Sequence, residues 1–383
     1  MRLPLPLTTL ASWLLPSRIL LHPHQFPSTI DVMVTRGIVG RLTRQLAEGE
    51  HPGIDTTCCI NEIQRKRPCS ICKMSCHVQA LDKIAQPDFT KCDNCGICMA
   101  HCPTNAIGAS RSFTQKLLEL LENKDSQLIL SCHQSDNPGD CSLSCLAAFP
   151  WEVFASLAIT GNQLAFLSGD CQNCHHRQQM PLFDRSLSQL ESFLGTEIYL
   201  KILSPDKTPR LQSRREAFNT LFRQGRRSAT SLWPEELRGA HDPKLWRKIL
   251  LHRLASQDSS QTPAFRETSF RQKIVAHWIA PIIEPDCRAC GICEKTCPNK
   301  ALQVVAANDN HFYMAHFGWK CQGCGICAAV CPWKNIKEFG LVAMEKADKP
   351  FVSLTEAKPC TKCKAPCHSS QSLCMECAAT NRS

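Results

Sequence analysis

The residues that decide the fold run from Cys287 to Pro332 and contain one cysteine pattern twice. The first copy reads Cys287-Arg-Ala-Cys290-Gly-Ile-Cys293-Glu-Lys-Thr-Cys297-Pro298. The second copy reads Cys321-Gln-Gly-Cys324-Gly-Ile-Cys327-Ala-Ala-Val-Cys331-Pro332. In each copy three cysteines are separated by two residues, and a fourth follows after three more and precedes a proline. Such close and regular spacing indicates a metal centre rather than a set of disulfides.

The pattern is that of a cubane [4Fe–4S] cluster. Three closely spaced thiolates wrap three corners of one cubane, and the small glycine lets the backbone approach the inorganic sulfides. The fourth cysteine opens a short helix that points away, so it reaches the other cluster, and the proline suits a helix start. We therefore predict two clusters with crossed ligation. One has the ligands Cys287, Cys290, Cys293 and Cys331, and the other has Cys321, Cys324, Cys327 and Cys297.

A second cysteine block lies near the N-terminus. Its complete run reads Cys92-Asp-Asn-Cys95-Gly-Ile-Cys98-Met-Ala-His-Cys102-Pro103, and its partner is the degenerate Cys69-Ser-Ile-Cys72-Lys-Met-Ser-Cys76-His77, with histidine where proline is expected. The missing first cysteine is Cys58 or Cys59, and a longer loop before Cys69 is tolerated because loop closure costs grow slowly with length. The predicted sets are Cys59, Cys69, Cys72 and Cys102, with Cys58 as the alternative to Cys59, and Cys92, Cys95, Cys98 and Cys76.

Between the two blocks the sequence predicts a βαβ unit. Leu128–Leu130 reads as a buried strand, 145–160 as a loop and helix interrupted at Pro150, and Leu164–Leu167 as a second strand after Gly161. The two strands should be parallel and buried. A helix is also expected over Phe113–Glu122.

Cysteines follow both of these strands, where ligands of parallel sheets bind. Cys132 follows the first strand, Cys171-Gln-Asn-Cys174-His175-His176 follows the second, and Cys141 and Cys145 are expected in the loop that opens the helix. Three chemistries fit this convergence. They are a [2Fe–2S] cluster on Cys132, Cys145, Cys171 and Cys174, a zinc site that includes His175 or His176, and a redox-active thiol pair.

The C-terminal tail contains two further C-x2-C pairs, Cys360/Cys363 and Cys374/Cys377, with Cys367 between them. Four cysteines in two such knuckles are typical of a tetrahedral structural zinc site, which would leave Cys367 spare. Since Cys367 offers another ligand, an additional iron–sulfur cluster is the alternative.

Composition places these motifs in a chain of 383 residues that can hold two or three domains and contains 27 cysteines. Clusters need thiolates and a reducing supply of iron and sulfide, which favours the cytoplasm. The apolar run after Arg2 lacks a signal-peptide cleavage site and is interrupted by prolines, so a start at Met33 or a leader is expected, and no run is long enough for a membrane span.

The net charge of +10 comes largely from the Arg-rich residues at about 205–275. Helices are expected over Ser213–Phe222 and Asp242–Leu254, the second capped by Asp242, and a short amphipathic helix over 33–50. A basic surface for an acidic redox partner or RNA is the functional interpretation, and a solvated linker with a packing helix is the simpler one. Nucleic-acid binding is the weaker prediction.

With both cysteine blocks in view, the chain resembles bacterial multi-cluster ferredoxin proteins of the 4Fe–4S dicluster type. The resemblance implies a core of two hairpins and two short helices around the clusters, and it favours Cys59 because Cys59-Ile-Asn-Glu resembles a Cys-Leu-Asn stretch of similar proteins. It departs at the split first motif, at His77 and in the longer hairpin of Ala301–Lys320. Such proteins often serve molybdopterin oxidoreductases such as formate dehydrogenases. Residues 128–176 loosely resemble the delta-type electron-transfer subunit of methyl-viologen-reducing hydrogenases, which carries a [2Fe–2S] cluster.

Together these features predict an α+β fold, with two ferredoxin-like dicluster units flanking a small α/β unit and a four-cysteine knuckle at the C-terminal end. The expected segments are a leader and helix (1–50), a dicluster domain (51–110), a cysteine-containing α/β domain (111–200), a basic helical linker (201–278), a second dicluster domain (279–350) and the tail (351–383). The expected function is relay of single electrons through about four [4Fe–4S] clusters to or from a partner oxidoreductase. The alternative is an oxidoreductase whose 128–176 unit is fed by those clusters. No nicotinamide or flavin fingerprint is present.

Overall fold

The computed structural model describes residues 51–63, 68–81, 88–123, 125–137, 139–203, 242, 244–256, 276–307, 311–344 and 350–380. The chain separates into Met1–Ala47 and Glu48–Ser383, and every described residue belongs to the second unit. The helices expected over 33–50 and Ser213–Phe222 lie outside these residues.

The N-terminal cysteine block contains short helices. They are α2 (Ile60–Ile63), α3 (Ile71–Ser75) and α4 (Ile97–Ala100), and a bridge between Ile54 and Ile107 joins the ends of the block. Helices α3 and α4 pack against each other. Each begins within the cysteine run and ends before the fourth cysteine, so the expectation that the fourth cysteine opens the helix is wrong.

A parallel three-stranded sheet follows, with strand order β2-β1-β3. The strands are β1 (Gln127–Cys132), β2 (Cys141–Leu143) and β3 (Gln163–Leu167), and β1 pairs in parallel with both neighbours. The strands expected at 128–130 and 164–167 are therefore confirmed. The expectation that Cys141 lies in a loop is wrong, because the residues after Gly139 add a parallel strand beside β1.

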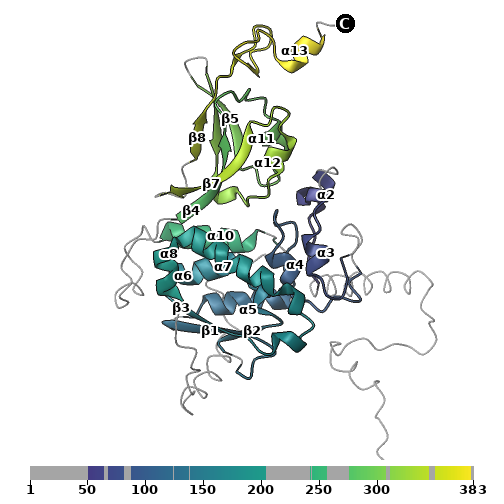
Figure 1. The fold of residues 1–383 in the computed structure, drawn as a ribbon, viewed down its shortest axis with the longest axis vertical. Coiled ribbons are helices and arrows are strands. Elements are labelled where there is room, and N and C mark those ends of the chain that lie inside the picture. Colours follow the sequence, from purple (N-terminus) through teal and green to yellow (C-terminus); the bar gives the residue numbers. More distant parts are fainter. Residues whose placement is uncertain are drawn as a thin grey trace, which may run out of the picture. The chain divides into compact units, whose positions relative to one another are not determined.

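Helices α5 (Arg111–Leu121) and α6 (Trp151–Ile159) lie on the same side of this sheet (Figure 1). Ser110 caps α5 by accepting the N–H of Phe113, and Pro150 occupies the N-cap position of α6. Helix α6 is buried along its whole length. This apolar helix forms the centre of the main core, and it fixes the loop that carries Cys145.

Helices α7 (Met180–Leu194), α8 (Thr196–Ile202) and α10 (Leu245–Ser256) complete this core. Helix α10 packs against α6, and its Trp246, Ile249 and Leu250 are buried. Asp242 accepts the N–H of Lys244, as expected for a cap, although Pro243 lies outside the described residues. The helix expected at 242–254 is thus present as α10.

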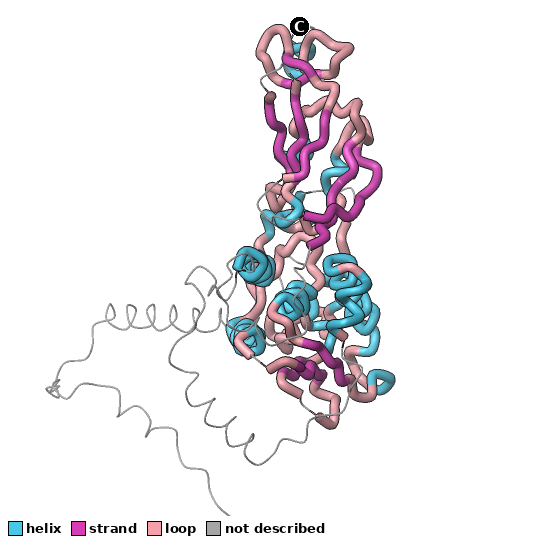
Figure 2. The backbone as a smooth tube through the Cα atoms, turned by 90° about the vertical axis from the view of Figure 1, so that its left-hand side faces the viewer, coloured by secondary structure: helices cyan, strands magenta, loops and turns pink. Residues whose placement is uncertain are grey.

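The second dicluster region contains two antiparallel groups of strands, seen as separate magenta groups in Figure 2. Strand β4 (Ala276–Ile283) pairs with β7 (Ile336–Met344), while β5 (Leu302–Ala306), β6 (Phe312–His316) and β8 (Phe351–Leu354) form a sheet in the order β5-β6-β8. Helices α11 (Ile292–Thr296) and α12 (Ile326–Val330) pack on each other. The hairpin expected within 301–320 is confirmed by the β5–β6 pair.

The tail contains the short antiparallel pair of β9 (Lys358–Pro359) and β10 (Pro366–Cys367), followed by α13 (Met375–Thr380). The small buried cluster of this segment is built around its cysteines. Helix and strand are mixed throughout, as predicted for the α+β class. Among the described residues, no helix is both long and apolar enough to cross a bilayer.

Candidate metal centres

In both cysteine blocks, the fourth cysteine of each motif has the same local geometry. In each case the backbone N–H four positions later donates to the cysteine Sγ at 3.1–3.3 Å, and the residue before that donor has a positive φ. These cysteines and their donors are Cys76 with Ala80, Cys102 with Ala106, Cys297 with Ala301, and Cys331 with Asn335. The degenerate N-terminal motif therefore keeps the backbone form of the complete ones, with His77 in place of proline.

The first half of the C-terminal motif surrounds one cavity. Its lining includes the predicted set of Cys287, Cys290, Cys293 and Cys331. Burial raises the pKa of Cys293 to about 12, and the charges of Cys287, Cys290 and Cys331 add to the rise. The crossed ligation predicted from spacing thus corresponds to four thiols that lie around one space.

The thiols of the second half of the C-terminal block also lie close enough to act on one another. Burial raises the pKa of Cys321 to about 11, with further contributions from Cys324 and Cys297. Burial also raises the pKa of Cys327, where Cys321 and Cys324 again contribute. The fourth predicted ligand, Cys297, comes from the other motif, as crossed ligation requires.

The N-terminal block forms two comparable groups. Cys76, Cys92, Cys95 and Cys98 line one cavity. In the other group, burial raises the pKa of Cys72 to about 12, and the thiols of Cys102, Cys69 and Cys59 add to the rise.

The structure also distinguishes the two candidates for the missing first ligand. Cys58 Sγ donates to Asp55 Oδ2 at 3.3 Å, whereas Cys59 is among the thiols whose charges act on Cys72. The carboxylate raises the pKa of Cys58, after the larger effect of burial. These contacts favour Cys59 as the ligand.

The α/β unit gathers cysteines at the carboxyl ends of its strands. Cys132, Cys145, Cys171 and Cys174 line one cavity, together with His176. Backbone N–H groups of Gly169 and His176 donate to the Sγ atoms of Cys132 and Cys174 at 3.2 and 3.4 Å. Cys141 is absent from this lining, since its strand carries it elsewhere in the sheet.

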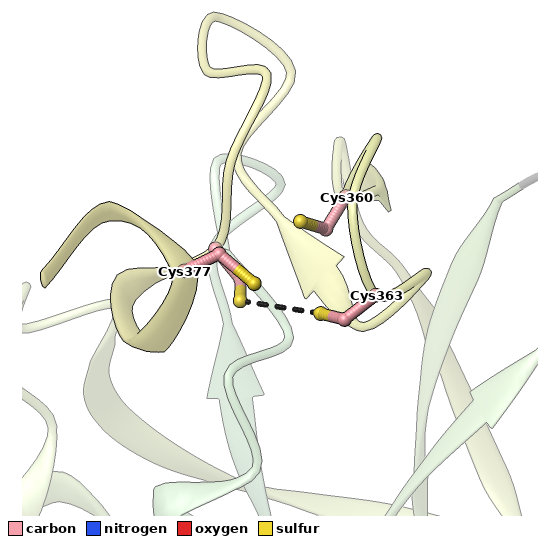
Figure 3. A group of neighbouring side chains, drawn as sticks. Cys360, Cys363 and Cys377 are labelled. Atoms are coloured by element: carbon pink, nitrogen blue, oxygen red, sulfur yellow. Dashed lines mark hydrogen bonds between the residues drawn. The ribbon is translucent and has the colours of Figure 1, made fainter. Parts of the chain in front are cut away.

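The tail brings its two knuckles together. One sulfur from each of Cys360, Cys363, Cys374 and Cys377 lies within 4.8 Å of all the others. Figure 3 shows the labelled thiols of this group turned toward one another, and the Sγ atoms of Cys363 and Cys374 are 3.5 Å apart. Four thiolates at about 2.3 Å from one tetrahedral ion lie roughly 3.8 Å apart, so this group suits a single ion.

Hydrogen bonds in the tail affect Cys360 and Cys367 differently. Backbone N–H groups of Cys363 and Cys374 lower the pKa of Cys360 to about 6, whereas the side-chain hydrogen bond with Cys363 raises the pKa of Cys377, so only part of the group favours the thiolate that a metal needs. The spare Cys367 instead donates its thiol to the carbonyls of Lys358 and Gln371, both at 3.4 Å. It is thus engaged outside the four-cysteine group.

Comparison with known protein families agrees with the dicluster geometry. Residues 286–335 match the family described as 4Fe-4S dicluster domain, and residues 85–108 match the 4Fe-4S binding domain. The chain contains two 4Fe–4S ferredoxin-type domains. The matches support this part of the predicted resemblance and do not support its restriction to bacteria. No curated protein and no solved structure gave a significant match.

The C-terminal ferredoxin-type domain receives a buried cation from α10. The Arg247 guanidinium lies 3.2 Å from Glu152 Oε1, donates to Gln322 Oε1 at 2.9 Å, and is 5.0 Å from the ring centroids of Trp151 and Trp278. It also contacts the carbonyl of Cys321 at 3.5 Å and lowers the pKa of that thiol, against the larger effect of burial. Nothing in the cysteine motifs indicates this cation, because α10 is distant in sequence.

Burial of the ligands in both ferredoxin-type domains has a chemical consequence. Desolvation is the largest cause of the raised pKa values of Cys72, Cys293 and Cys321, and it favours the protonated thiol at each of these positions. Cluster binding must therefore release protons and offset that desolvation. A cubane core supplies the positive iron charge that does so.

Proposed function

We propose that this protein relays single electrons through four [4Fe–4S] clusters, two in each cysteine block. The observation that carries the proposal is the convergence of four cysteine sets, each composed of three cysteines from one motif and the fourth from its partner. Each cubane accepts one electron on reduction and returns it on oxidation, so no substrate pocket is needed. Potentials would be set by burial, nearby charge and N–H donors to sulfur.

Neighbouring sets also lie close enough to interact. Cys72 is among the thiols that act on Cys98, which joins the two N-terminal sets. Cys102 is among those that act on Cys324, which joins the N-terminal and C-terminal blocks. This succession supports a relay in which an electron passes from one cluster to the next.

The test uses the anaerobically purified full chain. Stoichiometric dithionite should bleach the broad visible absorbance, with about one electron taken up per cubane, and an oxidised one-electron viologen acceptor should restore it. Replacing the crossed ligand Cys297 with serine should remove reducing equivalents while leaving the sets of the N-terminal block. Absence of reversible bleaching would refute the proposal.

A second candidate function is supported by the four cysteines around the α/β cavity. We propose that a [2Fe–2S] cluster or a redox-active thiol pair at this site exchanges electrons with the cubanes and reduces a substrate. A Cys171→Ser/Cys174→Ser variant separates the two functions. Electron uptake by the cubanes should persist under both, whereas substrate turnover would be abolished only under the second.

The ferredoxin-type domains imply a redox partner protein. A molybdopterin oxidoreductase such as a formate dehydrogenase, and a cytoplasmic location, remain predictions based on resemblance and on the need for reduced thiols. Anaerobic co-purification with the native chain, followed by assay of the partner's viologen-linked activity, tests the first. Recovery of a partner without molybdopterin would contradict it.

A further inference from the structure

Four polar side chains from two distant segments converge beside the cysteine cavities. They are His77, Asp93, His175 and His176, and one ligand atom from each lies within 4.8 Å of the others. His77 Nε2 is 3.2 Å from Asp93 Oδ2. The ring centroid of His77 lies 4.2 Å from that of His176 and 4.8 Å from that of His175. The ring centroids of His175 and His176 are 4.3 Å apart. We refer to these four residues as the histidine–aspartate group.

The buried histidine of this group lacks the partners that a buried imidazole normally has. His176 is only 1% exposed, and among the described residues neither of its ring nitrogens has a hydrogen-bond partner. Nδ1 of His77 is also buried without a partner. A buried polar atom that stays without a partner destabilises the folded chain. Imidazole nitrogens that surround one point and lack hydrogen-bond partners can donate their lone pairs to a metal ion.

We propose that the histidine–aspartate group binds one divalent first-row transition-metal ion through three imidazole nitrogens and one carboxylate oxygen. Such ligands suit Zn²⁺ and Fe²⁺. Ligand atoms about 2.0–2.2 Å from a tetrahedral ion are roughly 3.3–3.6 Å apart, so small side-chain rotations complete the site. Asp93 and His175 are exposed, which gives an ion access from solvent, while His176 anchors the inner side.

This site is separate from the cysteine sets but adjoins two of them. His77 and Asp93 directly follow Cys76 and Cys92, whereas His175 directly follows Cys174. The ion would thus tie the N-terminal ferredoxin-type domain to the end of the α/β sheet. It also gives a role to His77, the residue that stands where the motif expects proline. This site differs from the zinc site anticipated from cysteines with His175 or His176, because its ligands include no sulfur.

The test measures zinc and iron in the same full-length samples. A Cys374→Ser/Cys377→Ser background removes the tail knuckle, so that any remaining zinc reports other sites. Zinc titration of this background, followed by X-ray absorption at the zinc edge, should give about one ion per chain with nitrogen and oxygen at roughly 2.0–2.2 Å and no sulfur shell. Asp93→Asn and His175→Gln should each weaken zinc binding about tenfold or more, with iron unchanged.

Matched controls are available in exposed positions. Asp88 lies in the same segment as Asp93, and His311 lies beside the β5–β6 hairpin. Asp88→Asn and His311→Gln should both leave zinc affinity unchanged. Zinc binding that is unaffected in Asp93→Asn and His175→Gln would overturn the proposal. A zinc shell containing sulfur, or zinc lost only together with iron, would also overturn it, because the ion would then belong to the cysteine sites.

Discussion

At the scale of single residues, Arg247 is a cation that is buried together with its carboxylate partner Glu152. It is 7% exposed, as is its partner Glu152, and it lies against two tryptophan rings and the carbonyl of Cys321. A buried charge that loses its partner is costly because the remaining ion is neither hydrated nor paired. The ion pair therefore links α6, α10 and the loop of Cys321 only while both members are present.

We predict that Arg247→Met lowers the free energy of unfolding by about 3–5 kcal/mol, because it leaves the Glu152 carboxylate buried and unpaired. The Arg247→Met/Glu152→Gln double variant should lose less than the sum of the single changes. Denaturant unfolding of all four proteins measures this coupling. Lys248→Met on the same helix, which breaks the more exposed pair with Asp242, should cost no more than about 1 kcal/mol. Equal costs for Arg247→Met and Lys248→Met would contradict the account.

His316 provides a pH-dependent prediction away from the cysteines. It is 1% exposed on β6, and burial lowers its pKa to about 4. Because the folded pKa is below the unfolded value of about 6.5, protonation favours the unfolded chain. The stability linked to this neutral imidazole is full above about pH 6.5 and is lost as pH falls toward about 4.

Between about pH 7.5 and about pH 5.5, this residue should remove about 1.3 kcal/mol from the free energy of unfolding. Urea unfolding of the native chain and of His316→Leu at both pH values measures it. Over this pH interval, His316→Leu should lose about 1.3 kcal/mol less stability than the native chain. An identical pH dependence in both proteins would show that folding does not shift the pKa of His316, and would contradict the account.

At the scale of elements, a glycine precedes each short helix of the complete cysteine runs. Gly96 and Gly325 have φ values of +80° and +76°, which side-chain-bearing residues rarely adopt. Their surroundings differ. A Cβ at Gly96 would lie 2.2 Å from the Phe113 ring, whereas nothing lies within 4 Å of one at Gly325.

Gly325→Ala should therefore cost about 1–2 kcal/mol, the price of the left-handed backbone. Gly96→Ala should cost more, since the Phe113 ring must also move, and its domain should lose cluster occupancy first. Unfolding free energy and iron content of the two variants provide the comparison. A smaller effect at Gly96 than at Gly325 would contradict the close approach of the Phe113 ring to Gly96.

Many of the helices and strands were predictable from the sequence. Buried apolar runs and cysteines at their ends predicted β1, α6 and β3, and the hairpin at 301–320 followed from the longer spacing between Cys297 and Cys321. Strand β2 was not predictable, because three residues give no clear alternation and its parallel partner is specified only by packing. The histidine–aspartate group was missed because spacing does not show that residues 77 and 93 meet residues 175 and 176. The unusual His77 was the available signal.

At the scale of the whole molecule, the tail knuckle should be independent of the iron–sulfur domains. Its four sulfurs suit one ion, and its core consists mainly of its own cysteines. We predict that Cys363→Ser/Cys377→Ser removes about one zinc per chain, while iron and sulfide stay unchanged. Metal analysis of the purified variant is the measurement, with Cys367→Ser as the control that should retain zinc. Loss of iron in the double variant would instead assign a cluster to the tail.

The central claim is that both cysteine blocks hold two cubanes each. The most direct measurement is the number of iron and acid-labile sulfide atoms per anaerobically purified chain, with EPR after dithionite reduction. Four [4Fe–4S] clusters predict about sixteen of each and spectra of interacting clusters, with about two more of each if the α/β site holds a [2Fe–2S] cluster. About eight irons and spectra from one pair would show that only one block is loaded. A colourless protein containing zinc alone would contradict the account entirely.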